Sequence, residues 1–248
     1  MKVSDVIRAV LFDLDGTLLH VDTREFIEAY IRLLATWFSR RVEPGQFVRH
    51  LREATQAMIN NRDPSRTNRE VFAQTFYGPL GLTEASAADH LAEFYAREYP
   101  TLQALTRSDP TARRAVVATL NSGLQAVLAT NPIFPETAIR QRMAWAGVAD
   151  LPFARVTHYE NSHFCKPHLE YFLEVCSAIA RRPAECLMVG NDTDEDVAVR
   201  SVGMQSYLVT DHLINPRRQP LRADYVGTLA EAASFLEAAD FAAPRSQR

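Results

Sequence analysis

The chain reads RAVLFDLDGT over residues 8–17. Its unbroken apolar run is typical of a strand buried on both faces of a parallel sheet. The run ends in an acidic turn, where Asp13 and Asp15 stand two positions apart. If the extended geometry continues to that point, both carboxylates leave the same side of the strand. We therefore take residues 8–14 as the first strand and the two aspartates as the start of a candidate site.

Two different patterns follow this strand. Between residues 22 and 99, apolar residues at spacings of three and four predict amphipathic helices, whose aromatic residues we read mostly as the core of a helical bundle. After about residue 105, strands alternate with helices, which predicts a parallel sheet with helices on both faces. We therefore expect an α/β fold: a doubly wound parallel sheet built from residues 1–20 and 105–248, with a helical insertion at 21–104. Residues 239–248 are expected to be partly disordered.

The elements of the α/β part can be given by residue range. Strands are expected at 124–129, 154–157, 186–189 and 205–209. Helices are expected at 111–121, 136–146, 167–180, 194–202 and 229–238. Asp109 and Pro110 have the residue types that favour the start of the first of these helices, as N-cap and first helical residue.

Composition excludes several classes of protein. The 248 residues are 47% hydrophobic and 23% charged, which is an ordinary globular balance. The net charge of −3 gives no general attraction to nucleic acid or to an anionic membrane. We find no apolar run long enough for a transmembrane helix and no secretory signal. Three cysteines without C-x-x-C spacing argue against a disulfide framework and favour a cytoplasmic location. The oligomeric state, monomer or dimer, is left open.

Polar residues follow several predicted strands. Thr130 and Asn131 come after the second strand, and Gly190-Asn191-Asp192 after a later one. Ligands of open parallel sheets bind beyond the carboxyl ends of the strands, so these residues are expected to gather at one edge. Lys166 lies in a loop before a helix. It and Lys2 are the only lysines among 27 basic residues. Arginine cannot replace the compact ammonium of a lysine, so this scarcity hints at a role for Lys166.

These residue types indicate a particular chemistry. Carboxylates at short range repel one another unless a cation lies nearby. With no histidine or cysteine partner in the pattern, oxygen ligands suit a hard cation, and Mg²⁺ fits best. Lys166 would add a fixed positive charge and Thr130 a hydroxyl. Together these groups can hold a phosphoryl group and stabilise the charge on its oxygens.

The set resembles the haloacid dehalogenase (HAD) superfamily, through four motifs in the family's order. These are Asp13-Leu14-Asp15-Gly16-Thr17, Thr130, Lys166-Pro167 and Gly190 through Asp196. The helical insertion also lies where this family carries an α-helical cap of the C1 type, as in enzymes resembling phosphoglycolate phosphatase. The resemblance implies a HAD-like fold and a Mg²⁺-dependent phosphatase that acts on a small phosphorylated metabolite.

The resemblance also implies a role for each residue. Asp13 would attack phosphorus and form an aspartyl-phosphate, and Asp15 would act as general acid and then general base. Thr130 and Lys166 would bind the phosphoryl group. Gly16, Thr17 and Asn131 are carried over as further substrate-binding positions. The metal ligands would be Asp13, Asp15 (through its backbone carbonyl) and an acidic residue of the fourth motif.

The fourth motif departs from the commonest pattern of the family. Asn191 stands where many relatives have an aspartate, but Asp192 and Asp196 satisfy a shorter Asp-x-x-x-Asp spacing. We therefore predict Asp192 as a metal ligand with Asp196 in support, while the amide oxygen of Asn191 stays an open alternative. Asp194 and Glu195 are interpreted as charges at the start of a helix, near the positive end of its dipole, and not as ligands.

Other functions share part of this pattern. Asp15 argues against a dehalogenase, because that branch lacks the second aspartate of the first motif. A phosphomutase uses the same groups and stays an alternative. Receiver domains of signalling proteins share an aspartate, a threonine, a lysine and Mg²⁺, but they are about half this length and have no helical insertion. A phosphonate hydrolase would need a lysine in the cap, and the chain has none between Lys2 and Lys166. A non-catalytic relative ranks low, because no motif residue is missing.

Overall fold

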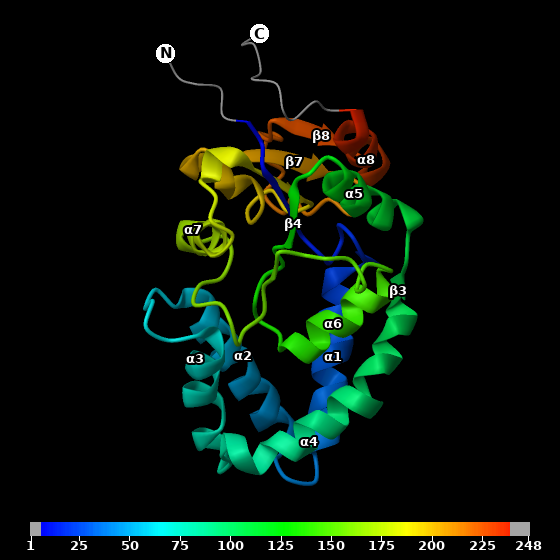
Figure 1. The fold of residues 1–248 in the computed structure, drawn as a ribbon. Coiled ribbons are helices and arrows are strands. Elements are labelled where there is room, and N and C mark those ends of the chain that lie inside the picture. Colours follow the sequence, from blue (N-terminus) through cyan, green and yellow to red (C-terminus); the bar gives the residue numbers. More distant parts are fainter. Residues whose placement is uncertain (1–5, 239–248) are drawn as a thin grey trace.

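The computed structural model describes residues 6–238 and contains a six-stranded parallel sheet (Figure 1). The strand order is β5-β4-β1-β6-β7-β8, so the predicted first strand lies inside the sheet. The strands are β1 (Ala9–Phe12), β4 (Gln125–Leu128), β5 (Arg155–Val156), β6 (Cys186–Gly190), β7 (Gln205–Val209) and β8 (Tyr225–Gly227). The predicted α/β class is confirmed, with β8 as a strand that the sequence reading missed.

Alternate residues of β1 pack into different cores. Val10 and Phe12 belong to a cluster with residues of α5 (Pro110–Asn121), α6 (Glu136–Trp145) and α8 (Leu229–Ala238). Ala9 and Leu11 belong to a second cluster, with α7 (Leu169–Ala178) and the 3₁₀ helix η4 (Val197–Val202). Successive side chains of a strand point to opposite faces, so helices cover both faces of this sheet.

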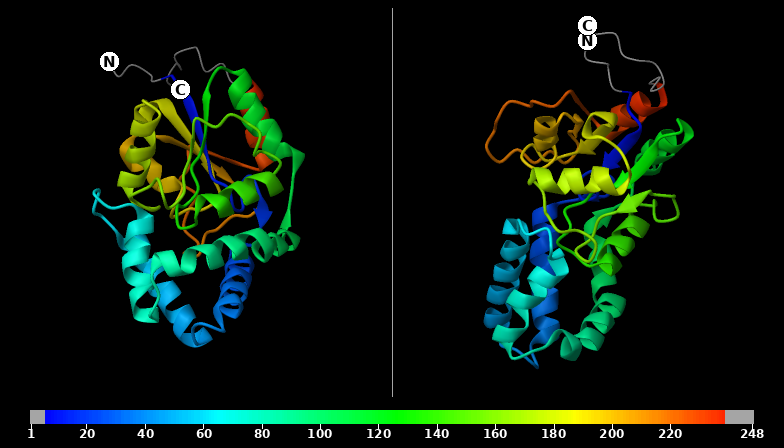
Figure 2. Two further views of the ribbon diagram at one scale, coloured as in Figure 1. Left: turned by 60° about the horizontal axis from the view of Figure 1, so that its bottom comes forward. Right: turned by 60° about the vertical axis from the view of Figure 1, so that its left-hand side comes forward.

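The segment after β1 is helical, as predicted. It contains α1 (Thr23–Phe38), α2 (Pro44–Asn60), α3 (Asn68–Phe76), the 3₁₀ turn η1 (Gly78–Leu80) and α4 (Glu84–Arg97). Asp22 caps α1 by accepting a hydrogen bond from the Glu25 amide, and Thr67 and Glu70 form a capping box at α3. Figures 1 and 2 show these helices grouped beyond the sheet edge at which β1 ends.

The helical segment joins the sheet through a short antiparallel ribbon. β2 (His20–Val21) enters the segment, and β3 (Thr106–Arg107) leaves it after the 3₁₀ helix η2 (Tyr99–Leu105). The sequence reading missed this ribbon, because two-residue strands carry no usable periodicity. The ribbon lies close to both limits of the predicted insertion, and the division at residues 21 and 104 stays a prediction.

One expected helix takes a different form. The predicted α-helix at 194–202 is the shorter 3₁₀ helix η4, preceded by turns. Asp192 Oδ1 accepts hydrogen bonds from the amides of Asp194 and Glu195, and Asp196 Oδ2 accepts one from the Asp192 amide. These bonds between side chains and backbone compete with the start of a regular helix.

Two other expectations concern the ends of the chain and the membrane. The predicted disorder of residues 239–248 lies outside the described residues. Within residues 6–238, no helix combines the length and the apolar character needed to cross a bilayer. The three cysteines are buried free thiols.

Candidate active site

Lys166 binds two carboxylates that come from different parts of the chain. Its Nζ lies 2.8 Å from Asp13 Oδ1, just after β1, and 2.6 Å from Asp196 Oδ1, just before η4. The lysine side chain is fully buried. A buried ammonium is costly unless it is paired, so these contacts fix both the lysine and the first aspartate. Burial lowers the pKa of Lys166, but the two carboxylates outweigh that effect and raise the pKa well above its ordinary value.

The predicted nucleophile has an unusual electrostatic environment. Burial raises the pKa of Asp13 to about 8, against the lowering effect of Lys166. A nucleophilic carboxylate must be ionised, and a cation near its second oxygen would favour that form. The electrostatics of Asp13 therefore suit a site that takes up a further positive charge.

A pocket of about 180 Å³ lies beside these groups. Predicted site residues that line it are Asp13, Asp15, Thr130, Asn131, Asp192 and Asp196, together with Asn191. Lys166, Gly16 and Thr17 do not line the pocket, although Lys166 contacts two residues that do. The strand ends thus bring the motif residues together, as the parallel topology predicts.

The turn after β4 presents Thr130 and Asn131 to the pocket. The Thr130 carbonyl accepts hydrogen bonds from the hydroxyls of Thr157 (2.7 Å) and Tyr171 (2.9 Å), which hold this turn in place. Among residues 6–238, the Thr130 hydroxyl has no hydrogen-bond partner, so it is available to a ligand. Asn131 Nδ2 donates to both carboxylate oxygens of Glu195, at 3.1 and 3.2 Å.

Glu195 corrects one expectation from the sequence. We interpreted it as a charge at the start of a helix, yet it lines the pocket and is held by Asn131. Burial raises the pKa of Glu195 to about 7, against the lowering effect of Lys166. The prediction of a helix start at Glu195 was wrong because the segment forms turns here, which direct the Glu195 side chain toward the pocket. Asp194 points elsewhere and accepts a hydrogen bond from Gln219 Nε2.

Most side-chain oxygens of Asn191, Asp192 and Asp196 in the fourth motif accept hydrogen bonds within the protein, and one remains free at the pocket. Asn191 Oδ1 accepts from the Thr17 hydroxyl (3.1 Å), and its Nδ2 donates to the His212 carbonyl (2.6 Å). Both carboxylate oxygens of Asp196 are engaged, with Lys166 and with the Asp192 amide. Asp192 uses only Oδ1 in the hydrogen bonds found within the described chain. Its other oxygen is therefore free for a ligand.

The donor set fits Mg²⁺. No group of three or more histidine, cysteine, aspartate or glutamate side chains within residues 6–238 forms a ready metal cage. Magnesium, however, commonly takes one or two carboxylates and completes its shell with water and phosphate oxygens. The second oxygens of Asp13 and Asp192, both at the pocket, provide such a pair. The four predicted ligands stay predictions.

Gly16 allows the close approach of the first and fourth motifs. Its φ is +80°, and a Cβ there would lie 2.3 Å from Asn191 Nδ2.

We expect Gly16→Ala to reduce both activity and stability, because the alanine would be strained in the left-handed conformation and its Cβ would displace Asn191. Gly147→Ala is the matched control, because Gly147 has φ +72° but open space around it. In urea unfolding the control should lose about 1–2 kcal/mol and Gly16→Ala at least about 1 kcal/mol more. Equal losses would contradict this account.

Arg142 is a site residue that the sequence reading missed. It lies on α6, is 1% exposed and pairs with Asp15 Oδ2. Its guanidinium also lies over the Phe134 ring, 4.3 Å from the centroid. A signal was present in the sequence, because Arg142 follows the apolar residues Ala138 and Ile139 at helical spacing and so falls on the buried face of α6. Burial raises the pKa of Asp15, and Arg142 acts against that rise.

Comparison with known proteins decides the family. The model of the haloacid dehalogenase-like hydrolases matches residues 7–199. The chain belongs to this family. The match runs from β1 into η4, so this haloacid dehalogenase-like hydrolase carries its four motifs within the matched region.

Solved structures with the same fold have different activities in their names. The hydrolase is similar to a HAD phosphatase from Thermococcus onnurineus, with 21% identity, TM-score 0.59 and coverage of 93% of this chain and 98% of the other. A predicted phosphoglycolate phosphatase from Haemophilus somnus has 16% identity, TM-score 0.56 and coverage of 92% and 97%. An L-2-haloacid dehalogenase from Xanthobacter autotrophicus has 21% identity, TM-score 0.53 and coverage of 94% and 99%. No curated protein sequence matches this hydrolase. At these identities the similarity establishes the fold alone.

Proposed function

We propose that this hydrolase is a Mg²⁺-dependent phosphatase that cleaves a small phosphate monoester through an aspartyl-phosphate on Asp13. The observation that carries the proposal is the 2.8 Å contact between Lys166 Nζ and Asp13 Oδ1, beside a pocket that Asp15 and Asp192 also line. This arrangement leaves one oxygen of Asp13 free to attack and supplies groups that stabilise a phosphoryl group.

Each residue then has a defined task. Asp13 attacks phosphorus with its free oxygen, while Lys166 holds the other oxygen and offsets charge. Asp15 gives a proton to the leaving oxygen and later takes one from the water that hydrolyses the intermediate. Burial favours the protonated form of Asp15 and Arg142 favours the ionised form, which suits a group that works in both directions.

Two residues complete the proposed site. Asp192 and Asp13 would hold Mg²⁺, which supplies positive charge next to the phosphoryl oxygens when it is bound. Asp196 would act through Lys166 as a positioning residue, since both of its oxygens are engaged. In this proposal Asp196 orients the lysine and does not serve as the supporting metal ligand that the sequence predicted.

The acidic residues of the pocket bear on the choice between a phosphatase and a dehalogenase. Asp15, Asp192 and Glu195 would repel any anionic substrate in the absence of a cation, so they support a reaction in which the substrate binds together with a metal ion. The proposed Mg²⁺-dependent phosphatase has that requirement. The second aspartate of the first motif, which the dehalogenase branch lacks, supports the same choice.

The proposal extends to the setting of the enzyme. Helices α1–α4 would form a cap over the pocket, because Thr23 and Ile27 of α1 contribute to the pocket wall. The free thiols are consistent with a cytoplasmic location. The partner is a small phosphorylated substrate and not a nucleic acid or a membrane, as the net charge of −3 suggests.

Magnesium dependence is the direct test. Phosphate release from p-nitrophenyl phosphate should fall at least about 10²-fold after removal of divalent ions with EDTA, and return when Mg²⁺ is added. Activity that persists without metal would contradict the magnesium assignment. Halide release from a haloacid without any phosphatase activity would overturn the proposal. Transfer of the phosphoryl group to another hydroxyl of a sugar phosphate, without free phosphate, would favour the phosphomutase alternative.

A further inference from the structure

A larger cavity adjoins the catalytic pocket. Its volume is about 680 Å³, against about 180 Å³ for the catalytic pocket. Five residues line both hollows: Thr23, Ile27, Ile133, Phe134 and Ile214. The two hollows thus share a wall, and a molecule that occupied both would place one end beside Asp13 and the other end in the large cavity. A cavity of this size is in the usual range of small-molecule sites.

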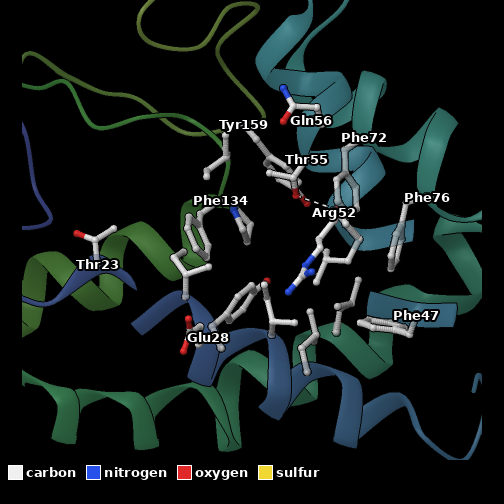
Figure 3. Close-up of a pocket in the computed structure, with 18 of the residues that line it drawn as sticks. Thr23, Glu28, Phe47, Arg52, Thr55, Gln56, Phe72, Phe76, Phe134 and Tyr159 are labelled. Carbon is white, nitrogen blue, oxygen red and sulfur yellow. Dashed lines mark hydrogen bonds between the residues drawn. The ribbon is translucent and has the colours of Figure 1, made fainter. Parts of the chain in front are cut away.

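The walls of this cavity are aromatic and aliphatic. Phe47 of α2 and Phe72 and Phe76 of α3 line one side, and Phe134, which follows β4, lies on the opposite side (Figure 3). Ile31, Leu34, Leu51 and Leu91 add aliphatic surface from α1, α2 and α4. Such a lining favours burial of apolar carbon and offers few hydrogen bonds to a polar ligand.

Several polar side chains of the cavity are already engaged. The hydroxyls of Tyr30 and Tyr95 bond to each other at 2.9 Å, and the Thr55 hydroxyl donates to the Leu51 carbonyl at 2.8 Å. Arg24 pairs with Glu28, and Gln56 with Asn60. Tyr77 and Tyr159 also line the cavity, and no hydrogen bond of their hydroxyls is found within residues 6–238.

Arg52 is an exposed residue whose guanidinium points in among the residues that line the cavity (Figure 3), and no hydrogen bond or ion pair of its side chain is found within residues 6–238. The cavity thus holds a few free polar groups, the hydroxyls of Tyr77 and Tyr159 and the Arg52 guanidinium, within a wall of mostly aromatic and aliphatic side chains. A sugar or a nucleoside would bury most of its hydroxyl groups against carbon here, at a cost in binding.

We propose that the substrate is a phosphate monoester of an apolar alcohol, with its phosphoryl group at Asp13 and its hydrocarbon in the cavity beneath α1–α3. This inference rests on the proposed phosphatase function and names the leaving group. The bond between phosphorus and the alcohol oxygen breaks as Asp13 bonds to phosphorus, and the proton of Asp15 completes the released alcohol. Water then cleaves the aspartyl-phosphate and frees inorganic phosphate.

A homologous series of esters tests the substrate class. We expect kcat/KM of the full chain with Mg²⁺ to rise about fourfold per methylene from ethyl to octyl phosphate, because each added methylene is buried. Glucose 6-phosphate should be at least about 10²-fold poorer than octyl phosphate. Equal or better turnover of the sugar ester, or no dependence on chain length, would overturn the inference and leave the phosphatase function intact. Failure to hydrolyse any ester, p-nitrophenyl phosphate included, would overturn the phosphatase function and the inference with it.

A pair of substitutions tests the cavity itself. Thr55 lines the cavity, whereas Thr36 is exposed on α1, and each hydroxyl donates to the carbonyl four residues before it. Thr55→Trp should lower kcat/KM for octyl phosphate at least about tenfold and change that for ethyl phosphate less than about twofold, because the indole fills the cavity. Thr36→Trp should change neither. Equal losses on both esters for Thr55→Trp, or an unchanged preference for octyl phosphate, would contradict the assignment.

If Thr55→Trp does not fold, inhibitors of the unmodified enzyme give the same answer. Octyl phosphonate, which cannot be hydrolysed, should inhibit hydrolysis of p-nitrophenyl phosphate at least about 10²-fold more strongly than ethyl phosphonate. Equal inhibition by the two phosphonates would overturn the inference.

Discussion

Replacement of Asp13 with asparagine is expected to lower kcat/KM for p-nitrophenyl phosphate by about 10⁴-fold or more. The amide oxygen is a poor nucleophile, so the covalent intermediate cannot form. The side chain keeps its shape, and Lys166 keeps Asp196 as a partner. Steady-state phosphate release gives the loss, and acid quenching during turnover should trap phosphoprotein in the wild type only.

The loss should not be a consequence of unfolding. Because burial raises the pKa of Asp13 to about 8, the metal-free native state holds its proton more tightly than the unfolded chain does. This group therefore lowers stability as pH rises from about 4 to 8, and neutral asparagine avoids that cost. At pH 7.5 the metal-free variant should melt at or above the wild-type temperature.

Asp194→Asn is the matched control for Asp13→Asn. Asp194 belongs to the fourth motif but does not line the pocket, and its carboxylate accepts from Gln219. This variant should keep at least about half of the wild-type activity. Full activity in Asp13→Asn would refute the covalent role of Asp13, and a similar loss in both variants would show that the effect is not specific to the nucleophile.

Arg142→Met is expected to cost about 3–5 kcal/mol of unfolding free energy at pH 7. The substitution leaves the Asp15 carboxylate, which is 19% exposed at the pocket, without its cation and removes the contact of the guanidinium with Phe134. Methionine fills much of the space of the arginine stem, so the charge and not a cavity dominates the loss. Urea denaturation followed by circular dichroism measures it.

Two companion variants separate the ion pair from general effects on α6. Arg140→Met removes a half-exposed arginine of the same helix, which pairs with Glu136, and should cost less than about 0.5 kcal/mol. The double variant Asp15→Asn/Arg142→Met should recover most of the stability, because loss of both charges of a buried pair is often neutral. A cost for Arg142→Met no larger than that for Arg140→Met would show that the pair does not stabilise the fold.

The sequence was sufficient for five of the six strands of the sheet, but not for β8, and for most of the residues that line the pocket. The apolar run before Asp13 marks a buried strand, and parallel strands end at one edge, so Thr130 and Asp192 had to lie near Asp13. A role for Lys166 could be predicted because lysine is rare in this chain and because the residue occupies the third place in the order of the motifs. The family match then confirmed the fold and the superfamily.

Other features depend on packing that no local pattern encodes. Arg142 meets Asp15 only because α6 packs beside the end of β1, and Glu195 turns inward because side-chain bonds replace the first turn of a helix. The aromatic residues of the insertion read as bundle core. Most of them do belong to the core cluster, and Tyr30, Phe72, Phe76 and Tyr95 also line the cavity. The sequence allowed one or two to line a substrate pocket but could not say which, because spacing on each helix does not say how far apart the helices stand.

The ribbon of β2 and β3 constrains how the enzyme can open. Both passages of the chain between the sheet and α1–α4 run side by side there and are hydrogen-bonded to each other, with His20 opposite Arg107. The helical segment is tied to the α/β part at a second place as well, where the amides of Asn68 and Arg69 at the start of α3 donate to the carbonyls of Ser162 and Tyr159. If the proposed hydrocarbon substrate enters by a movement of the four helices, the bonds at α3 have to break, while the ribbon can keep both passages of the chain together.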